Sequence, residues 1–320
     1  MNYELAVIEI LGKTKIDFIA WRRTAFGVSS LLCLLGIVAI IQIARGAANL
    51  GIDFAGGTSV QLKFQRPVDL GQVRALLGAN GLKDSEPQQF EGEDRIVVLS
   101  KRAEGCQAGM AQRVQDIFLK GFPDNPLVVE GTNEVGPAIG KELQKAALWA
   151  ITISMIGIIV YIAWRFEFKF GVAAAIATFH DVLAVLGFFY VLNREITLLI
   201  VTALLTLAGY SLTDTVVVFD RIRENLRGRR RESLGDVINM SINEVLGRTM
   251  VTSLTVFLVL IALFLLGGEV LHDFSLALIA GVCVGTYSSW FVASPIVYEW
   301  RSWERARMKA PVKVKAKAKG

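Results

Sequence analysis

The sequence has few of the residues on which secreted scaffolds and metal sites depend. It contains three cysteines, two histidines and seven prolines among 320 residues. Cys33 and Cys283 lie inside apolar runs, which excludes a secreted disulfide-bonded scaffold. Two histidines are too few for a histidine-based metal cluster, and no glycine-rich nucleotide-binding loop is present. We therefore expect no metal, no cofactor, no ATP hydrolysis or other enzyme activity, and no nucleic-acid partner.

Apolar and charged residues are separated into blocks. The chain is 53% hydrophobic with a mean hydropathy of +0.49, yet 20% of its residues are charged. This segregation is typical of a membrane protein with several spans and one polar insert. A helix of about 20 residues crosses a hydrocarbon core of about 30 Å. Six spans are predicted, at 24–44, 146–164, 170–193, 196–219, 249–268 and 274–298. The first is too long for a signal peptide, so we expect it to be retained.

An even number of spans places both termini on the same side of the membrane. Lysine and arginine gather in four segments, 1–23, 165–169, 220–248 and 299–320. The loops on the opposite side, 193–195 and 268–273, contain a single arginine. The positive-inside rule therefore predicts that both termini are cytoplasmic. The basic tail, 299–320, is expected to be disordered from Lys309 onwards and to rest on anionic lipids of the inner surface.

The polar insert, 45–145, is therefore expected outside the cytoplasm. Its apolar spacing reads strand, helix, strand, strand, helix, strand. This order predicts one α+β domain with a ferredoxin-like arrangement. Gly56 and Gly57 suit a sharp turn where the chain enters the first strand, a structural role. Gly136 and Pro137 end the last strand and form a candidate hinge to the second span.

A few ionisable residues interrupt the spans, at a cost of about 2.5–3.5 kcal/mol each. The third predicted span contains His180 and Asp181, and the fourth contains Asp214. Arg248 and Thr252, four residues apart, share one helix face at the start of the fifth. Asp214 is the strongest functional candidate, because it lies deep in an apolar run. Alternative roles are helix packing for Asp181, a core histidine for His180 and a headgroup anchor for Arg248.

Two intramembrane aspartates also suggest an intramembrane aspartyl protease, with one acid and one base. Such enzymes carry a Gly-x-Gly-Asp signature. Here Ser211-Leu-Thr precedes Asp214, so this alternative is disfavoured.

Five motifs occur in an order that resembles the SecF family of the bacterial Sec protein-export machinery, a relative of the resistance-nodulation-division transporters. The resemblance covers nearly the whole chain, and the fourth motif is the most specific. The five motifs are Gly51-Ile-Asp53-Phe-Ala-Gly-Gly-Thr58, Val135-Gly-Pro137, Phe179-His-Asp181, Gly209-Tyr-Ser-Leu-Thr-Asp-Thr-Val-Val-Val-Phe-Asp-Arg-Ile-Arg-Glu224 and Ser241-Ile-Asn-Glu-Val-Leu-Gly-Arg-Thr249.

The resemblance implies an accessory subunit of the Sec translocase in the bacterial cytoplasmic (inner) membrane. It implies a SecD partner, a SecYEG channel, often YajC, and translocating preproteins as cargo, driven by the proton-motive force. We expect Asp214 to be the protonatable group, Arg248 its alternating charge partner and Thr252 a hydrogen-bonding neighbour. His180 and Asp181 are expected to line the same route. Asp53, Gly56, Gly57, Gly136 and Pro137 are expected to be structural or hinge residues.

Two other functions remain open at this point. A small-molecule or lipid exporter of the same superfamily would need a larger outer region with a substrate cleft. A passive subunit would only stabilise the translocon, with its outer domain as a docking surface.

Overall fold

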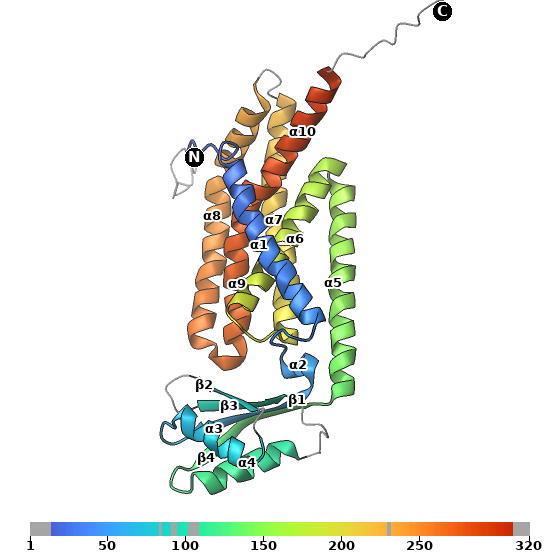
Figure 1. Ribbon diagram of the computed structural model, residues 1–320. Coiled ribbons are helices and arrows are strands. Elements are labelled where there is room, and N and C mark those ends of the chain that lie inside the picture. The colour runs from blue at the N-terminus through green and yellow to red at the C-terminus, as the bar shows by residue number, and fades with distance from the viewer. Residues whose placement is uncertain (1–13, 83–84, 91–94, 102–108, 229–231, 310–320) are drawn as a thin grey trace, which may run out of the picture.

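The protein is described here from a computed structural model, which describes residues 14–82, 85–90, 95–101, 109–228 and 232–309. A helical bundle carries an α+β domain at one end. Helix α1 begins at the opposite end, and α10 ends there (Figure 1). Within the described residues, six helical segments are long and apolar enough to cross a membrane, as predicted. They are α1 (Arg22–Ala44), α5 (Pro137–Arg165), α6 (Phe168–Val191), α7 (Leu198–Gly228), α8 (Leu234–Leu266), and the continuous run of α9 (Gly268–Ser288), π-helical η1 (Ser289–Ala293) and α10 (Ser294–Lys309).

Several helices extend well beyond their predicted spans. The predicted loop 220–248 is largely helical, because α7 continues to Gly228 and α8 begins at Leu234. Helix formation there is favoured by polar contacts between the two helices, such as Arg221 with Glu244 at 2.7 Å. The predicted tail is likewise helical up to Lys309, and its remainder, 310–320, lies outside the described residues. A hydropathy pattern marks only the apolar part of a helix, so it missed these polar ends.

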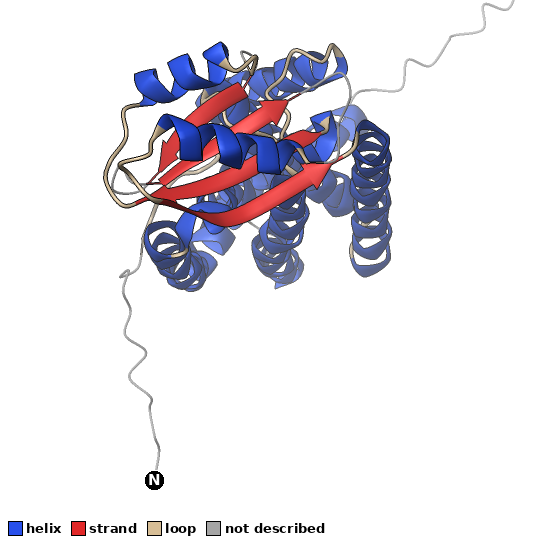
Figure 2. Ribbon diagram, turned by 90° about the horizontal axis from the view of Figure 1, so that it is seen from below, coloured by secondary structure: helices blue, strands red, loops and turns tan. Residues whose placement is uncertain are grey.

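The α+β domain follows the predicted order of elements. They are β1 (Gly57–Phe64), α3 (Leu70–Ala79), β2 (Ser85–Phe90), β3 (Arg95–Lys101), α4 (Met110–Gly121) and β4 (Leu127–Val135). The four strands pair antiparallel in the order β2-β3-β1-β4. Helices α3 and α4 cover the sheet face that is turned away from the bundle (Figure 2). Alternate residues of β1, Val60, Leu62 and Phe64, are buried, and they belong to the same core as Phe118 of α4.

Helices α6 and α7 lie at the centre of the bundle, whereas α5 lies at its edge and exposes most of its apolar residues. Helix α1 crosses α6 at a pair of glycines. A Cβ atom on Gly36 would clash with the backbone carbonyl of Leu183, and one on Gly187 would lie 2.7 Å from the amide nitrogen of Gly36. Small residues of this kind let membrane helices approach closely.

A short helix, α2 (Ile52–Ala55), lies between the domain and the bundle. It is followed by Gly56 and Gly57, whose φ angles of 74° and 140° favour glycine. Gly57 pairs with Val135, the last residue of β4, so the two connections to the bundle lie side by side. Gly136 then caps α5, and Pro137 is its first residue. The candidate hinge at Pro137 is therefore the start of a long helix, and Gly136 is the one residue between β4 and α5.

Candidate functional site

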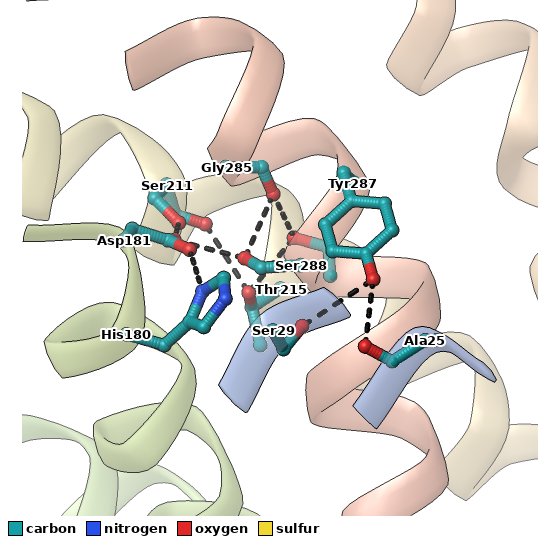
Figure 3. A network of polar contacts seen from close by, with 10 residues as sticks. Ala25, Ser29, His180, Asp181, Ser211, Thr215, Gly285, Tyr287 and Ser288 are labelled. Carbon is teal, nitrogen blue, oxygen red and sulfur yellow. Dashed lines mark hydrogen bonds and ion pairs between the residues drawn. The ribbon is translucent and has the colours of Figure 1, made fainter. Parts of the chain in front are cut away.

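Helices α6, α7 and α9 bring a group of polar side chains together inside the bundle (Figure 3). At its centre is Asp181 of α6, whose exposed fraction is 0%. One carboxylate oxygen accepts hydrogen bonds from Ser211 of α7 and, at 2.8 Å, from Ser288 of α9. The other lies 2.8 Å from Nδ1 of His180. The predicted pair His180 and Asp181 is thus joined, and two serines from other helices complete its surroundings.

The close approach of α9 to α7 positions these serines. Gly285 faces Ser211, and a Cβ atom on this glycine would lie 3.1 Å from the serine Cβ. Ser288 follows one turn later. The π-helical segment η1 begins directly after it, and there Ser289 lies 2.9 Å from Thr215 of α7. π-helical turns inside α-helices are frequent at functional sites.

Asp214 of α7 forms a second carboxylate site. Its exposed fraction is 6%, and it accepts a hydrogen bond of 3.3 Å from Ser253 of α8. The Ser253 hydroxyl also lies 2.8 Å from that of Thr286 on α9. A hydroxyl of α8 therefore bonds this carboxylate directly, and a hydroxyl of α9 is linked to it through Ser253.

One polar atom at the first site has no partner in the part of the chain that the structure describes. Nε2 of His180 is buried and makes no hydrogen bond to any described residue. A buried polar atom without a hydrogen bond is costly, so its presence favours a functional role for the site. A neutral imidazole that donates from Nδ1 to Asp181 leaves Nε2 as a free proton acceptor.

The structure does not bring Arg248 and Thr252 to Asp214. Both side chains are exposed, and among the described residues Asp214 is bonded by Ser253 and not paired with Arg248. The Thr252 hydroxyl donates to backbone carbonyls of its own helix instead. The buried face of α8 carries Thr249 and Ser253, each one residue further along. One residue turns a helix by about 100°, so in this structure Arg248 and Thr252 lie on a different face of α8 from Thr249 and Ser253.

Sequence reasoning also missed Ser288, Ser289 and Thr286. Their only signal was a run of small polar residues within an apolar span, Gly285-Thr-Tyr-Ser-Ser289. In the structure this run supplies hydroxyls to both carboxylate sites and to α1, whose Ala25 carbonyl accepts a hydrogen bond of 3.0 Å from Tyr287 (Figure 3).

Asp53 lies outside the bundle interior but contacts its central helix. One carboxylate oxygen accepts a hydrogen bond of 3.0 Å from the backbone N–H of Leu198, the first residue of α7. Asp53, for which a structural role was predicted, is thus bonded to the first residue of α7.

Comparison with known proteins now gives the family. Residues 122–303 match the family model described as protein export membrane protein SecD/SecF, C-terminal, and residues 48–68 match the SecD/SecF GG motif. Protein translocase subunit SecF of Thermodesulfovibrio yellowstonii is 51% identical over 294 residues, which cover 91% of this chain and 96% of that protein. The chain belongs to the SecF family. The SecF of Endomicrobium trichonymphae is 41% identical over 299 residues, which cover 93% of the chain and 95% of that protein.

A solved structure agrees with this assignment. SecDF, a translocon-associated membrane protein from Thermus thermophilus, matches with a TM-score of 0.80 and 35% identity over 90% of this chain. A structure of SecDF in a super-membrane-facing form matches with a TM-score of 0.68 and 34% identity over 93% of the chain. The chain spans about two fifths of SecDF, since 39% and 40% of those two chains are covered. Membership of the SecF family makes this a membrane protein with several spans and an accessory role in protein translocation.

Two motifs of this SecF-family chain meet where α7 ends and α8 begins. Asn225, directly after the motif that ends at Glu224, donates hydrogen bonds to Ser241 at 3.0 Å and to Glu244 at 2.7 Å. Glu244 also accepts from Arg221. The motifs thus hold together the two helices that carry Asp214 and Ser253.

Proposed function

We propose that this chain works with a SecD partner and uses the proton-motive force to promote preprotein export across the bacterial cytoplasmic membrane. The observation that carries the proposal is the burial of two carboxylates, Asp181 and Asp214, inside membrane-crossing helices with hydroxyl and imidazole partners. An ionisable group in a span is costly and usually belongs to an ion or proton pathway.

The surroundings of both carboxylates suit proton transfer. A hydroxyl group both donates and accepts hydrogen bonds, so Ser253 and Thr286 can reorient when Asp214 gains or loses a proton. His180 can hold a proton at Nε2 while its other nitrogen faces Asp181. Each proton that crosses 100 mV delivers about 2.3 kcal/mol, enough to shift a two-state equilibrium about fifty-fold.

Arg248 remains our candidate for the charge partner of Asp214. At 1.5 Å per residue, Asp214 lies about 24 Å along α7 from Leu198, and Arg248 about 27 Å along α8 from Leu266, so their depths are similar. In this proposal the described arrangement is the separated state, in which Asp214 holds a proton. The approach of Arg248, with Thr252 beside it, would favour release of that proton, because a cation stabilises the ionised carboxylate.

A second membrane half, supplied by SecD, accounts for the exposed side chains of α7. One face of α7 exposes small or polar residues, namely Thr202, Thr206, Gly209 and Thr213. The exposed face of α5 is instead strongly apolar, with Leu148, Trp149, Ile153, Ile156 and Val160. Apolar faces suit lipid, whereas small polar faces suit contact with another membrane helix. The match to only two fifths of SecDF supports the same partner.

We assign the α+β domain, on its element and strand order, to the ferredoxin-like arrangement. We place it outside the cytoplasm, where it would contact preproteins as they leave SecYEG. Both termini would be cytoplasmic, with the basic tail on anionic lipids and YajC as a further partner.

Replacement of the carboxylates tests the proton function. An asparagine cannot take up and release a proton, so Asp214→Asn should lower proton-driven export at least about tenfold, and Asp181→Asn likewise. Export would be measured in membrane vesicles with and without a proton gradient, with assembly checked by co-purification of SecD. Asp220→Asn is the matched control, since this aspartate of α7 is half-exposed and paired with Arg165. Normal export by Asp214→Asn and Asp181→Asn would instead favour the passive, translocon-stabilising subunit.

A further inference from the structure

Residues 49–57 form the joint between the outer domain and the bundle. Backbone hydrogen bonds hold this joint to the segment before α7, so it is not a free linker. The Gly51 N–H donates to the Ile196 carbonyl at 2.9 Å, and the Ile196 N–H donates to the Asn49 carbonyl at 2.8 Å. Leu50 and Ile196 form an isolated parallel β-bridge. Gly51 also leaves no room for a side chain, since a Cβ atom there would lie 2.7 Å from Thr197. The joint thus adheres to the segment directly before α7.

Asp53 extends this contact into the helix itself. The local N-cap of α7 is weak, because Thr197 accepts from Ile200 at 3.4 Å. The Asp53 carboxylate supplies a second acceptor, at 3.0 Å from the Leu198 nitrogen. A carboxylate at a helix N-terminus satisfies an otherwise unpaired N–H group and interacts favourably with the helix dipole. Asp53 thereby connects α2 to the helix that carries Ser211, Asp214 and Thr215.

The other side of the joint is fixed to α5. Gln144 donates a hydrogen bond of 2.7 Å to the Phe54 carbonyl, and a Cβ atom on Gly140 would lie 2.9 Å from the same oxygen. Only Gly56 lies between α2 and β1, and both Gly56 and Gly57, the first residue of β1, have positive φ angles. A displacement of α7 relative to α5 would therefore move α2, and α2 would in turn move the start of β1.

We propose that Asp53 is a positioning residue that transmits movement of α7 to the outer domain. The proposal rests on the proton-driven function above, since proton uptake at Asp214 or Asp181 would supply the movement. It gives a mechanical role to the segment that matches the GG motif, in which Asp53 and Gly51 hold α7 and the glycine pair lets the domain turn.

Asp53→Ala removes the contact and is the decisive variant. Amide hydrogen exchange at Leu198 should become about fivefold faster, the factor that corresponds to loss of about 1 kcal/mol of capping. Spin labels at Gln72 and Leu266, in a background without the native cysteines, should report a broader distance distribution between domain and bundle. Proton-driven export by the assembled complex should fall at least about fivefold, in line with the same loss.

Two control variants separate this role from general stability. Asp53→Asn keeps an oxygen that can cap α7, because Asn and Asp cap equally well, and should retain most of the export. Asp69→Ala removes a comparable cap, that of Asp69 on Gln72 at 3.0 Å in α3, which lies on the sheet face turned away from the bundle (Figure 2). It should leave both export and the distance distribution unchanged.

The proposal would be overturned if the Asp53→Ala variant exported within about twofold of the wild-type rate, whatever spin-label distance distribution this variant shows. An equal loss of export in Asp69→Ala would overturn it too, because the loss would then reflect only domain stability. If Asp214→Asn and Asp181→Asn both export normally, the proton function fails, and the exchange rate and distance distribution of Asp53→Ala still decide whether Asp53 joins α7 to the domain.

Discussion

At the scale of single residues, the two buried carboxylates are held by hydroxyl groups and one imidazole rather than by arginine or lysine. Asp181 is bonded by Ser211 and Ser288, and Asp214 is bonded by Ser253. Hydroxyl partners stabilise a carboxylate without fixing its charge, because they can accept a hydrogen bond from the protonated form and donate one to the ionised form. An arginine in permanent contact would hold the carboxylate ionised. The arrangement therefore suits a group that changes its protonation state.

Ser253→Ala tests this view at one hydrogen bond. The substitution removes the described side-chain donor to Asp214 and its link to Thr286, so we expect proton-driven export to fall about threefold to tenfold. The control is Thr255→Ala, because this exposed threonine of α8 bonds only the Thr252 carbonyl. Export would be followed over a series of outer pH values. A pH profile of Ser253→Ala that coincides with that of the wild type would contradict the prediction.

At the scale of helices, glycine sets the distances between neighbours. Gly36 and Gly187 let α1 cross α6, and Gly285 lets α9 approach α7 at Ser211. The second approach brings Ser288 within 2.8 Å of Asp181. Helix packing in a membrane depends on such close contacts, because lipid tails are as apolar as leucine and give no hydrophobic drive for association.

Gly36→Ala should therefore destabilise the bundle. The added methyl group meets the backbone of Leu183, which cannot move aside, and overpacking of this kind costs about 1–3 kcal/mol. Gly27→Ala, on the same helix, has no atom within 4 Å of its new Cβ and should be neutral or slightly stabilising. The free energy of unfolding in mixed detergent micelles would be compared. Equal stabilities of the two variants would show that the crossing is not tight.

At the scale of the whole molecule, the α+β domain and the polar ends of α7, α8 and α10 lie at opposite ends of the bundle (Figure 1). These polar ends carry basic residues such as Arg221, Arg227 and Arg305. This separation agrees with an orientation in which the domain lies outside and the basic ends lie in the cytoplasm.

Cysteine labelling of intact cells tests that orientation. A cysteine at the exposed Gln72 of α3 should react with a membrane-impermeant maleimide from outside, whereas one at the exposed Arg305 of α10 should react only after the cells are opened. The reverse pattern would invert the orientation and, with it, the proposed placement of the α+β domain outside the cytoplasm.

The sequence by itself determined the six membrane-crossing helices, the order of elements in the α+β domain, and the likeness to the SecF family. These features depend on local composition, on periods of two or 3.6 residues, and on short motifs, all of which can be read along the chain. The identity of Asp181 and Asp214 as the unusual buried carboxylates could be predicted for the same reason, since an ionisable residue in an apolar run is conspicuous.

Only the tertiary structure decided which groups these residues meet. Ser288 reaches Asp181 across 107 positions of sequence, and Asp53 reaches Leu198 across 145. On α8 the packing against α7 and α9 turned Ser253 inward and left Arg248 exposed, although the sequence pattern fitted either face. The rotation of a helix about its axis is set by close contacts with helices that are distant in sequence, so no local pattern contains it.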